Sequence, residues 1–240
     1  PGTVSALKSQ QRRWATGSIQ VARKLLPRIW RSPVSLGEKI EATLHLTHYS
    51  VSMWMLLLAL VARPMLFVFA DARLFAEWAW FAWGLIYFAA LAPSLVYIYA
   101  RHSLGGKWTG LRTIPGMMIL GCGLCVNNTL AVIRGLTLRG GEFIRTPKSG
   151  SVGVLSRPSS YNALHSKMWL IEIGLGLYSL ASFIVYMTAE YRAFSVFLLL
   201  YAVGLCMAGW LSRPLRFQTT SIVDNLSTES AALRPAVYEP

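Results

Sequence analysis

The chain has 240 residues, of which 54% are hydrophobic and only 14% are charged, and it carries a formal net charge of +13. This composition lies outside the range of soluble domains and predicts a membrane protein. Positive charge can indicate a nucleic-acid partner, but here the Lys and Arg residues flank long apolar runs, as membrane-orientation signals do. No nucleic acid is therefore expected as a partner.

Residues 1–40 begin with a basic amphipathic segment. From Leu7 to Arg31, apolar positions alternate with Lys and Arg, which is typical of an interfacial helix lying along lipid headgroups. Gly17 and Pro27 are expected to break this helix at one or both positions. Its first part would then address an active site, while the rest stays at the membrane surface.

The head of this segment reads Gln10-Gln11-Arg12-Arg13-Trp14. Gln10, Arg13 and Trp14 are spaced i, i+3 and i+4, so they project from one face of a helix. A guanidinium binds phosphate with two N–H groups, an amide donates beside it, and an indole face can stack on a sugar ring. These residues suit a sugar nucleotide, although an Arg-Arg-Trp triplet in isolation is more often a solvated basic face or an interfacial anchor.

Residues 41–112 contain two apolar stretches long enough to cross the hydrocarbon core, Leu44–Val61 and Trp78–Ala100. Pro93 is expected to kink the second span. The basic connector that follows, from residue 101 to residue 112, is expected on the cytosolic side. His45 and His48 lie near the entry of the first span, but no suitable third ligand accompanies them, so no metal site is predicted.

Residues 113–150 contain a third apolar stretch, Ile114–Ile133, which Gly, Asn and Thr residues interrupt. If this stretch does not cross, most Lys and Arg residues of the chain face one side; if it crosses, they divide almost evenly. The positive-inside rule therefore favours an interfacial or re-entrant helix on the cytosolic side. Cys122 and Cys125 have C-x-x-C spacing without a second pair or a basic neighbour, so they are interpreted as small buried residues.

Residues 151–216 supply a second pair of spans, Met168–Thr188 and Ala193–Leu211, and residues 217–240 form a polar tail expected on the cytosolic side. Glu172 is an acid near the start of the first of these spans. It either lines a polymer path or pairs at the membrane interface. The fold class expected is mainly α: a multi-pass membrane helical bundle of about four spans with cytosolic interfacial amphipathic helices.

Two motifs together resemble family 2 glycosyltransferases, the family of cellulose synthase and its processive relatives. The stretch from Gln10 to Trp14 resembles the Q-x-x-R-W motif, and Phe143-Ile144-Arg145-Thr146-Pro147-Lys148 resembles the F-x-V-T-x-K gating loop, in the same order and separated by hydrophobic spans. Arg145 stands where cellulose synthase has Val. This variant is closer to the mannan and xyloglucan-backbone branch and to bacterial glucomannan- or glucan-synthase-like relatives, so cellulose is not the implied product.

The resemblance implies an enzyme that transfers hexose from a nucleotide sugar, UDP-glucose or GDP-mannose, to a growing glycan acceptor. Gln10, Arg13 and Trp14 would be the catalytic motif, and Phe143, Arg145, Thr146 and Lys148 would bind the donor substrate. The family also needs Mg2+ or Mn2+ and a general base, both supplied by carboxylates. The two Asp residues, Asp71 and Asp224, and the scattered Glu residues form no such cluster.

An α/β nucleotide-sugar domain, with its metal, is therefore expected upstream of Pro1, and the chain is expected to be the membrane part of a longer polypeptide. The implied location is the bacterial inner (plasma) membrane, with both motifs cytosolic. Two alternatives remain open: a transferase that makes a single addition to a lipid-linked acceptor, and a non-enzymatic membrane scaffold or transporter.

Overall fold

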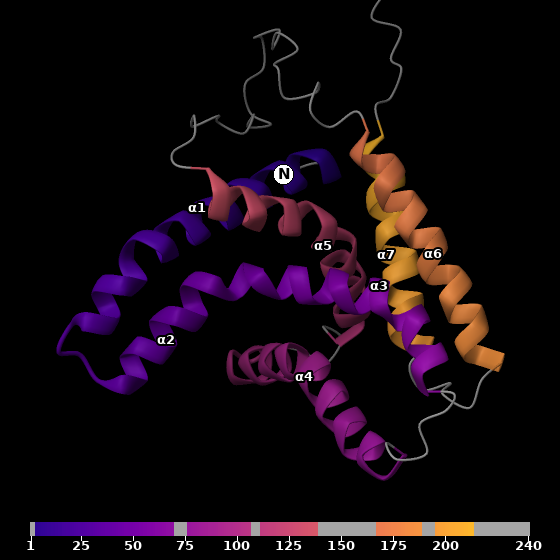
Figure 1. Cartoon of the computed structure of the whole chain (residues 1–240), viewed down its shortest axis with the longest axis horizontal. Helices are drawn as coiled ribbons and strands as arrows, with labels where there is room; N and C mark the ends of the chain where they lie inside the picture. Colours follow the sequence, from indigo (N-terminus) through magenta and orange to yellow (C-terminus); the bar gives the residue numbers. More distant parts are fainter. Residues whose placement is uncertain (1–2, 70–75, 107–110, 139–166, 189–194, 214–240) are drawn as a thin grey trace, which may run out of the picture.

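The computed structural model describes residues 3–69, 76–106, 111–138, 167–188 and 195–213. Within these ranges the chain is all-helical (Figure 1). The helices in chain order are α1 (Val4–Arg31), α2 (Leu36–Thr47), the short 3-10 helix η1 (His48–Ser50), α3 (Val51–Phe69), α4 (Ala76–Ser103), α5 (Thr113–Thr137), α6 (Met168–Thr188) and α7 (Ser195–Ser212).

Four stretches of the described chain are long and apolar enough to cross a membrane: Leu36–Met65, Thr113–Thr137, Met168–Thr188 and Ser195–Ser212. The chain is thus a multi-pass membrane helical bundle, as predicted. The predicted span Met168–Thr188 coincides with α6, and the predicted last span differs from α7 by only one or two residues at each end. The predicted second span lies within α4, some of whose side chains are outside the described residues.

Helix α1 is continuous, so the predicted break at Gly17 or Pro27 is wrong. Pro27 lies close to the end of the helix, where it removes only one backbone hydrogen bond. A Cβ atom on Gly17 would meet nothing within 4 Å. Packing of the buried residues around it, which include Ala15, Ile19 and Ala22, stabilises this part of the helix. Packing therefore outweighs the weak helix propensity of glycine at this position.

A tight connection that contains Ser32 and Pro33 joins α1 to α2. Ser35 and Glu38 form a capping box that begins α2, each satisfying a backbone N–H of the other. The two helices then run back beside each other and are tied by Trp30 Nε1, which donates to Thr43 Oγ1 at 3.0 Å. The helical hairpin extends away from the α6–α7 pair (Figure 1).

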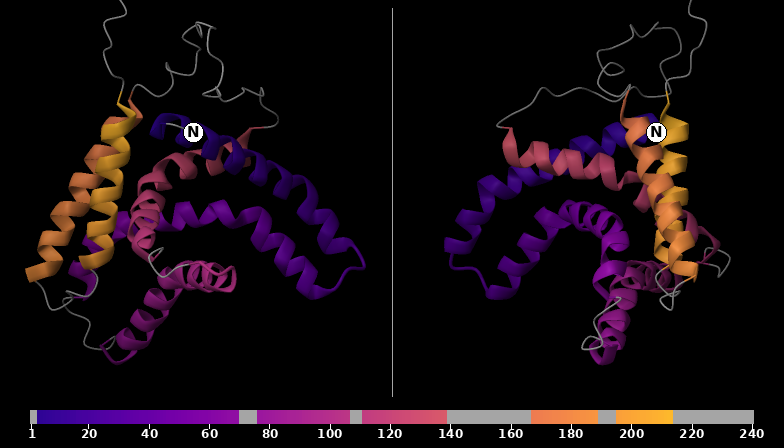
Figure 2. Two further views of the ribbon diagram at one scale, coloured as in Figure 1. Left: turned by 180° about the vertical axis from the view of Figure 1, so that it is seen from behind. Right: turned by 45° about the vertical axis from the view of Figure 1, so that its right-hand side comes forward.

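Helix α5 lies at the centre of the bundle, and residues 122–129 on it are all buried. It curves, so that its first part runs beside α7 and its last part lies along α1 (Figure 2). The buried core joins α5 to α3 and α7 through Ala59, Cys125, Val126, Tyr201 and Leu205. Its length and apolarity would allow α5 to span a membrane, and the interfacial or re-entrant arrangement stays a prediction.

Glycines allow the helices to approach closely at the crossing points. A Cβ atom on Gly123 of α5 would lie 2.5 Å from the carbonyl oxygen of Gly204 on α7. A Cβ atom on Gly135 would lie 2.9 Å from the carbonyl oxygen of Thr16 on α1. Because both neighbours are backbone atoms, these crossings require residues without side chains.

Candidate functional site

The three predicted motif residues Gln10, Arg13 and Trp14 all lie in the first half of α1. The buried positions of α1, which include Lys8, Ala15 and Ile19, recur at the spacing of one helix face. Successive residues turn by about 100° around a helix, so Gln10, Arg13 and Trp14 fall on the side away from that face. Trp14 is 53% exposed, and Gln10 and Arg13 are half-buried.

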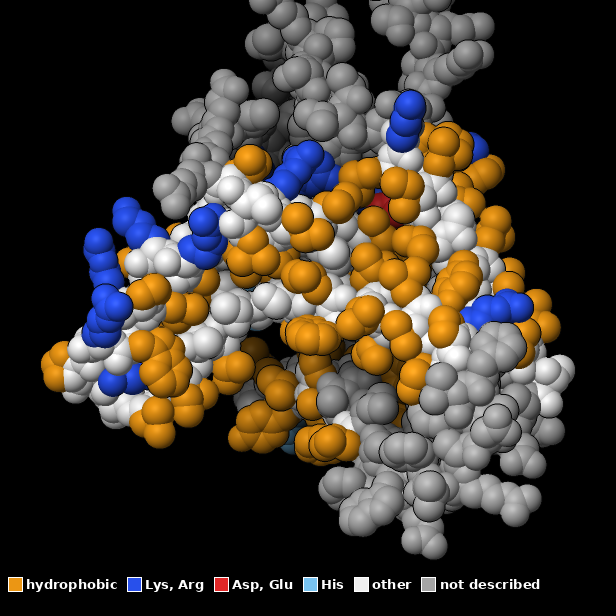
Figure 3. Space-filling view, viewed as in Figure 1, with side chains coloured by type: hydrophobic (Ala, Val, Ile, Leu, Met, Phe, Trp, Pro, Cys, Tyr) orange, Lys and Arg blue, Asp and Glu red, His pale blue; other side chains and the backbone are white. Residues whose placement is uncertain are grey.

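Residues in and around the motif thus lie on two different faces of α1. Lys and Arg side chains gather along α1 on the face of the molecule shown in Figure 3, whereas hydrophobic side chains cover much of the bundle beside it. An exposed indole next to half-buried amide and guanidinium groups forms a surface that can stack on a sugar ring and donate hydrogen bonds to phosphate. The geometry is compatible with the predicted binding role.

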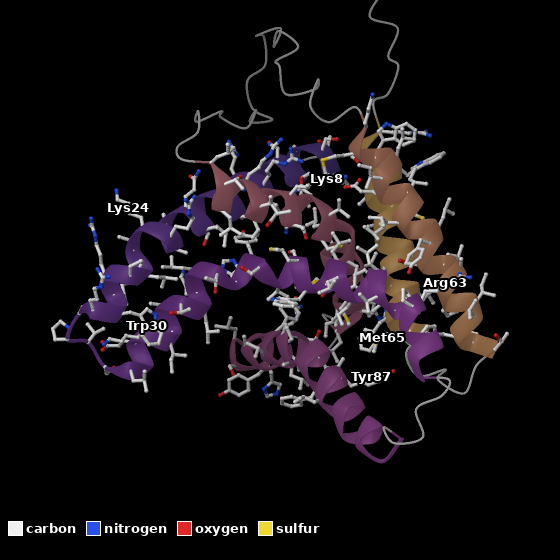
Figure 4. All side chains as sticks on the ribbon, viewed as in Figure 1. Lys8, Lys24, Trp30, Arg63, Met65 and Tyr87 are labelled. Atoms are coloured by element: carbon white, nitrogen blue, oxygen red, sulfur yellow. The ribbon has the colours of Figure 1, made fainter. Side chains whose placement is uncertain are left out.

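The buried face of α1 carries an ion pair that the sequence did not single out. Lys8, which is 1% exposed, donates to the Glu172 carboxylate of α6, and Glu172 is 0% exposed. Lys8 Nζ also donates to Ser212 Oγ at 2.7 Å and to the Ala208 carbonyl oxygen at 3.2 Å, both on α7. Figure 4 shows Lys8 where α1 meets the adjacent ends of α6 and α7.

The electrostatics of this meeting point favour the observed signs of charge. Lys8 Nζ lies at the C-terminal end of α7, where the helix dipole favours a positive charge. Burial lowers the pKa of Lys8, and the Glu172 carboxylate opposes that effect. The pair, with Ser212 and Ala208, gives the ammonium group three acceptors for its three N–H donors.

The arginine inside the motif, Arg12, lies about 100° around the helix from Arg13 and faces α5 and α6. Arg12 Nη2 donates to Asn127 Oδ1 at 3.0 Å and lies 2.9 Å from the sulfur of Met168. Asn127 Nδ2 in turn donates to the backbone carbonyl of Lys8 at 2.9 Å. Arg12 therefore ties α1 to α5 and α6, while Arg13 belongs to the outward face.

The second predicted motif belongs to a segment outside the described residues. The described residues on either side of this segment lie against α1. Leu138, just after α5, accepts hydrogen bonds from Arg23 Nη1 at 3.3 Å and from Gln20 Nε2 at 3.4 Å. Met168, at the start of α6, contacts Arg12. The predicted substrate-binding residues themselves lie outside the described residues: Phe143, Arg145, Thr146 and Lys148.

Metal binding finds no support within the described ranges, where no group of three His, Cys, Asp or Glu residues could hold an ion. His45 and His48 lie with ring centroids 6.1 Å apart, and His48 Nδ1 is 2.6 Å from the His45 carbonyl oxygen. Asp71 and Asp224 lie outside the described residues. Cys122 and Cys125 are free thiols buried in the core, as predicted for small packing residues.

Of the two interpretations of Glu172, the structure supports pairing, and its partner is Lys8. The sequence did indicate buried polar contacts of this kind, because an acid in one apolar span and consecutive asparagines in another must both find polar partners. The partner itself was not predictable, since Lys8 lies far away in the chain among many other basic residues.

Comparison with protein families, with curated proteins and with solved structures gives no match.

Proposed function

We propose that this chain is the membrane and acceptor-binding portion of an inverting, processive glycosyltransferase of the family 2 type. The observation that carries the proposal is the division of α1 into two faces. Packing, an ion pair and hydrogen bonds occupy one face, and Gln10, Arg13 and Trp14 lie on the other. A motif that served only to pack the bundle would be expected on the first face.

In the proposed reaction, a nucleotide sugar such as UDP-glucose or GDP-mannose donates one hexose to the end of a growing glycan. Trp14 stacks beneath the terminal sugar of this acceptor, because an exposed indole offers a flat apolar surface. Arg13 and Gln10 lie beside the donor diphosphate, where a guanidinium and an amide provide hydrogen bonds. The nucleotide-bound Mg2+ or Mn2+ and the general base belong to a catalytic domain preceding Pro1, and the glycan crosses the membrane between the spans.

The ends of the segment that holds the second motif add support. Leu138 is bonded to Gln20, which lies about 9 Å along α1 from Trp14 at the usual rise per residue. An extended chain from Leu138 to Phe143 reaches at most roughly 18 Å. The chain is therefore long enough for the residues proposed to bind the donor, Phe143 to Lys148, to reach the motif face, which is the face of α1 that carries Gln10, Arg13 and Trp14.

The proposed location is the inner membrane of a bacterium, with α1 on the cytosolic side, where sugar nucleotides are found. The stretches from Lys8 to Lys39 and from Arg134 to Lys167 contain many of the basic residues of the chain. If these stretches are cytosolic, the topology follows the positive-inside rule.

The test uses the full-length gene product in membranes, supplied in parallel with radiolabelled UDP-glucose and GDP-mannose and with Mg2+ or Mn2+. A high-molecular-weight, glycosidase-sensitive product from one donor is the expected result. Label confined to a small lipid-extractable product would replace polymer synthesis by single addition. Trp14→Ala should abolish incorporation without changing membrane insertion, whereas Lys24→Ala, an exposed change on the same helix, should retain it. Wild-type-like incorporation by Trp14→Ala would refute the role of the motif face.

A further inference from the structure

We propose that Lys8 and Glu172 are positioning residues that fix the rotation of α1 about its own axis, so that the motif face points away from the bundle. The structural part of this inference rests on the contacts of Lys8 alone. Its catalytic consequence rests on the function proposed above. Neither residue is proposed to touch the substrates.

The direction of the Lys8 side chain is fixed from three sides. Its ammonium group has three N–H donors, and the three acceptors around it are the Glu172 carboxylate, Ser212 Oγ and the Ala208 carbonyl oxygen. These acceptors come from two different helices, α6 and α7. Only one rotation of α1 presents a donor to all of them.

Apolar packing alone would not select a rotation so strongly. The apolar positions on the buried face of α1 include Ala15, Ile19 and Ala22, and such side chains pack without strong directional preference. A turn of α1 by one residue, about 100°, would withdraw the ammonium and leave the buried Glu172 carboxylate without its partner. Buried ion pairs are best attested in this role, in which they set register rather than add stability.

A second set of bonds acts on the same turn of α1 from α5. Asn127 accepts from Arg12 at 3.0 Å and donates to the Lys8 carbonyl at 2.9 Å. Gln10 and Arg13 are interleaved with the two residues held in this way. Trp14 follows roughly 9 Å along the helix axis from Lys8. The residues that fix the rotation are therefore within one or two turns of those that would bind substrate.

The inference is tested by the reactivity of single cysteines on the two faces of α1 in the full-length protein in membranes. Ala15 is 0% exposed and Val21 is 41% exposed, so Ala15→Cys reports the buried face and Val21→Cys reports the outward face. In the otherwise native chain, maleimide should label Val21→Cys at least about tenfold faster than Ala15→Cys. Peptide mass spectrometry separates this labelling from that of Cys122, Cys125 and Cys206.

The decisive variant replaces both charges, Lys8→Met together with Glu172→Met, so that no unpaired charge stays buried. The labelling ratio between the two faces should then fall from about tenfold to less than threefold. The matched control, Lys24→Met together with Glu41→Met, removes the same charges at exposed positions of α1 and α2 and should keep the ratio. Glu172→Gln, which keeps the side-chain shape, serves as a second variant and should lower the ratio severalfold.

Folding is checked independently by protection of Cys122 and Cys125, which are buried in the core. If a variant with this protection intact keeps the tenfold ratio, the positioning role of the pair is refuted. In the transfer assay, the Lys8→Met/Glu172→Met variant should lose at least tenfold in kcat, because rotation of α1 would move Trp14 and Arg13 away from the acceptor and the donor diphosphate. Absence of transfer by the wild-type protein would refute the proposed function and leave the labelling result standing.

Discussion

The crossing of α5 and α7 at Gly123 provides a sharp test of the packing. A methyl group added by Gly123→Ala would lie 2.5 Å from the Gly204 carbonyl oxygen and 3.1 Å from the Ala208 Cβ atom. Ordinary contact begins near 3.4 Å, so the helices would have to separate by about 0.9 Å at this point. The nearest atom belongs to the backbone and cannot rotate away. Overpacking of this kind costs about 1–3 kcal/mol.

The matched control is Gly121→Ala, two residues earlier on the same helix, where an added Cβ atom meets nothing within 4 Å. Both substitutions gain the higher helix propensity of alanine, worth about 1 kcal/mol. This gain cancels in the comparison, so the difference between the two variants isolates the contact with α7. Gly123→Ala should be less stable than Gly121→Ala by about 1–3 kcal/mol.

The assay is reversible unfolding of the detergent-solubilised chain by increasing SDS, followed by tryptophan fluorescence, with the free energy of unfolding compared between the two variants. A second pair repeats the test on α6. Gly176→Ala places a Cβ atom 2.5 Å from Cys206 Sγ, and Gly174→Ala meets nothing within 4 Å. The difference for this pair should be smaller, because the Cys206 side chain can rotate. Equal stability of Gly123→Ala and Gly121→Ala would show that the helices do not cross as described.

Four further predictions separate structural from binding roles. Arg12→Ala should lower the free energy of unfolding by about 1–3 kcal/mol through loss of the Asn127 bond, and unchanged stability would contradict that contact. Arg13→Ala should abolish transfer without changing membrane insertion, and wild-type-like transfer by this variant would contradict its substrate-binding role. Tyr186→Phe removes the hydroxyl that donates to the Ala62 carbonyl at 2.6 Å, so hydrogen exchange near the end of α3 should rise, and unchanged exchange would count against this contact. Lys148→Ala should raise the KM for the nucleotide sugar more than that for the acceptor; unchanged donor KM would remove the substrate-binding role of this residue.

The sequence was most informative where one local property determines the structure. The bounds of α6 follow from a mostly apolar run, with Glu172 as its one charged residue, whose length matches the hydrocarbon core. The end of α1 agrees with the Ser32-Pro33 pair, because proline disfavours the helical region for the residue before it and Ser32 is extended. In both cases the determining residues are neighbours in the chain, so no knowledge of tertiary packing was needed.

The sequence was least informative where a distant contact decides the outcome. Pro27 predicted a break, yet α1 continues through it because one missing hydrogen bond near a helix end is offset by packing of the preceding turns. Glu172 required a partner, but the sequence offered many basic residues and no means of choosing Lys8. Because several helices are similarly apolar, the sequence also could not show which glycines lie at helix crossings and which face open space.

The contacts of α1 also limit how a catalytic cycle could use it. Lys8 holds its first turns to α6 and α7, the Thr16 hydroxyl donates to the Ala131 carbonyl of α5 at 3.1 Å, and the Ser18 hydroxyl donates to the Leu46 carbonyl of α2 at 2.9 Å. A rocking motion of α1 would break directional bonds to four other helices at once. The motif face is therefore best understood as a fixed platform. In a reaction of the proposed kind, the donor-binding domain and the end of the glycan must come to Trp14, because Trp14 cannot move to them without releasing the buried lysine.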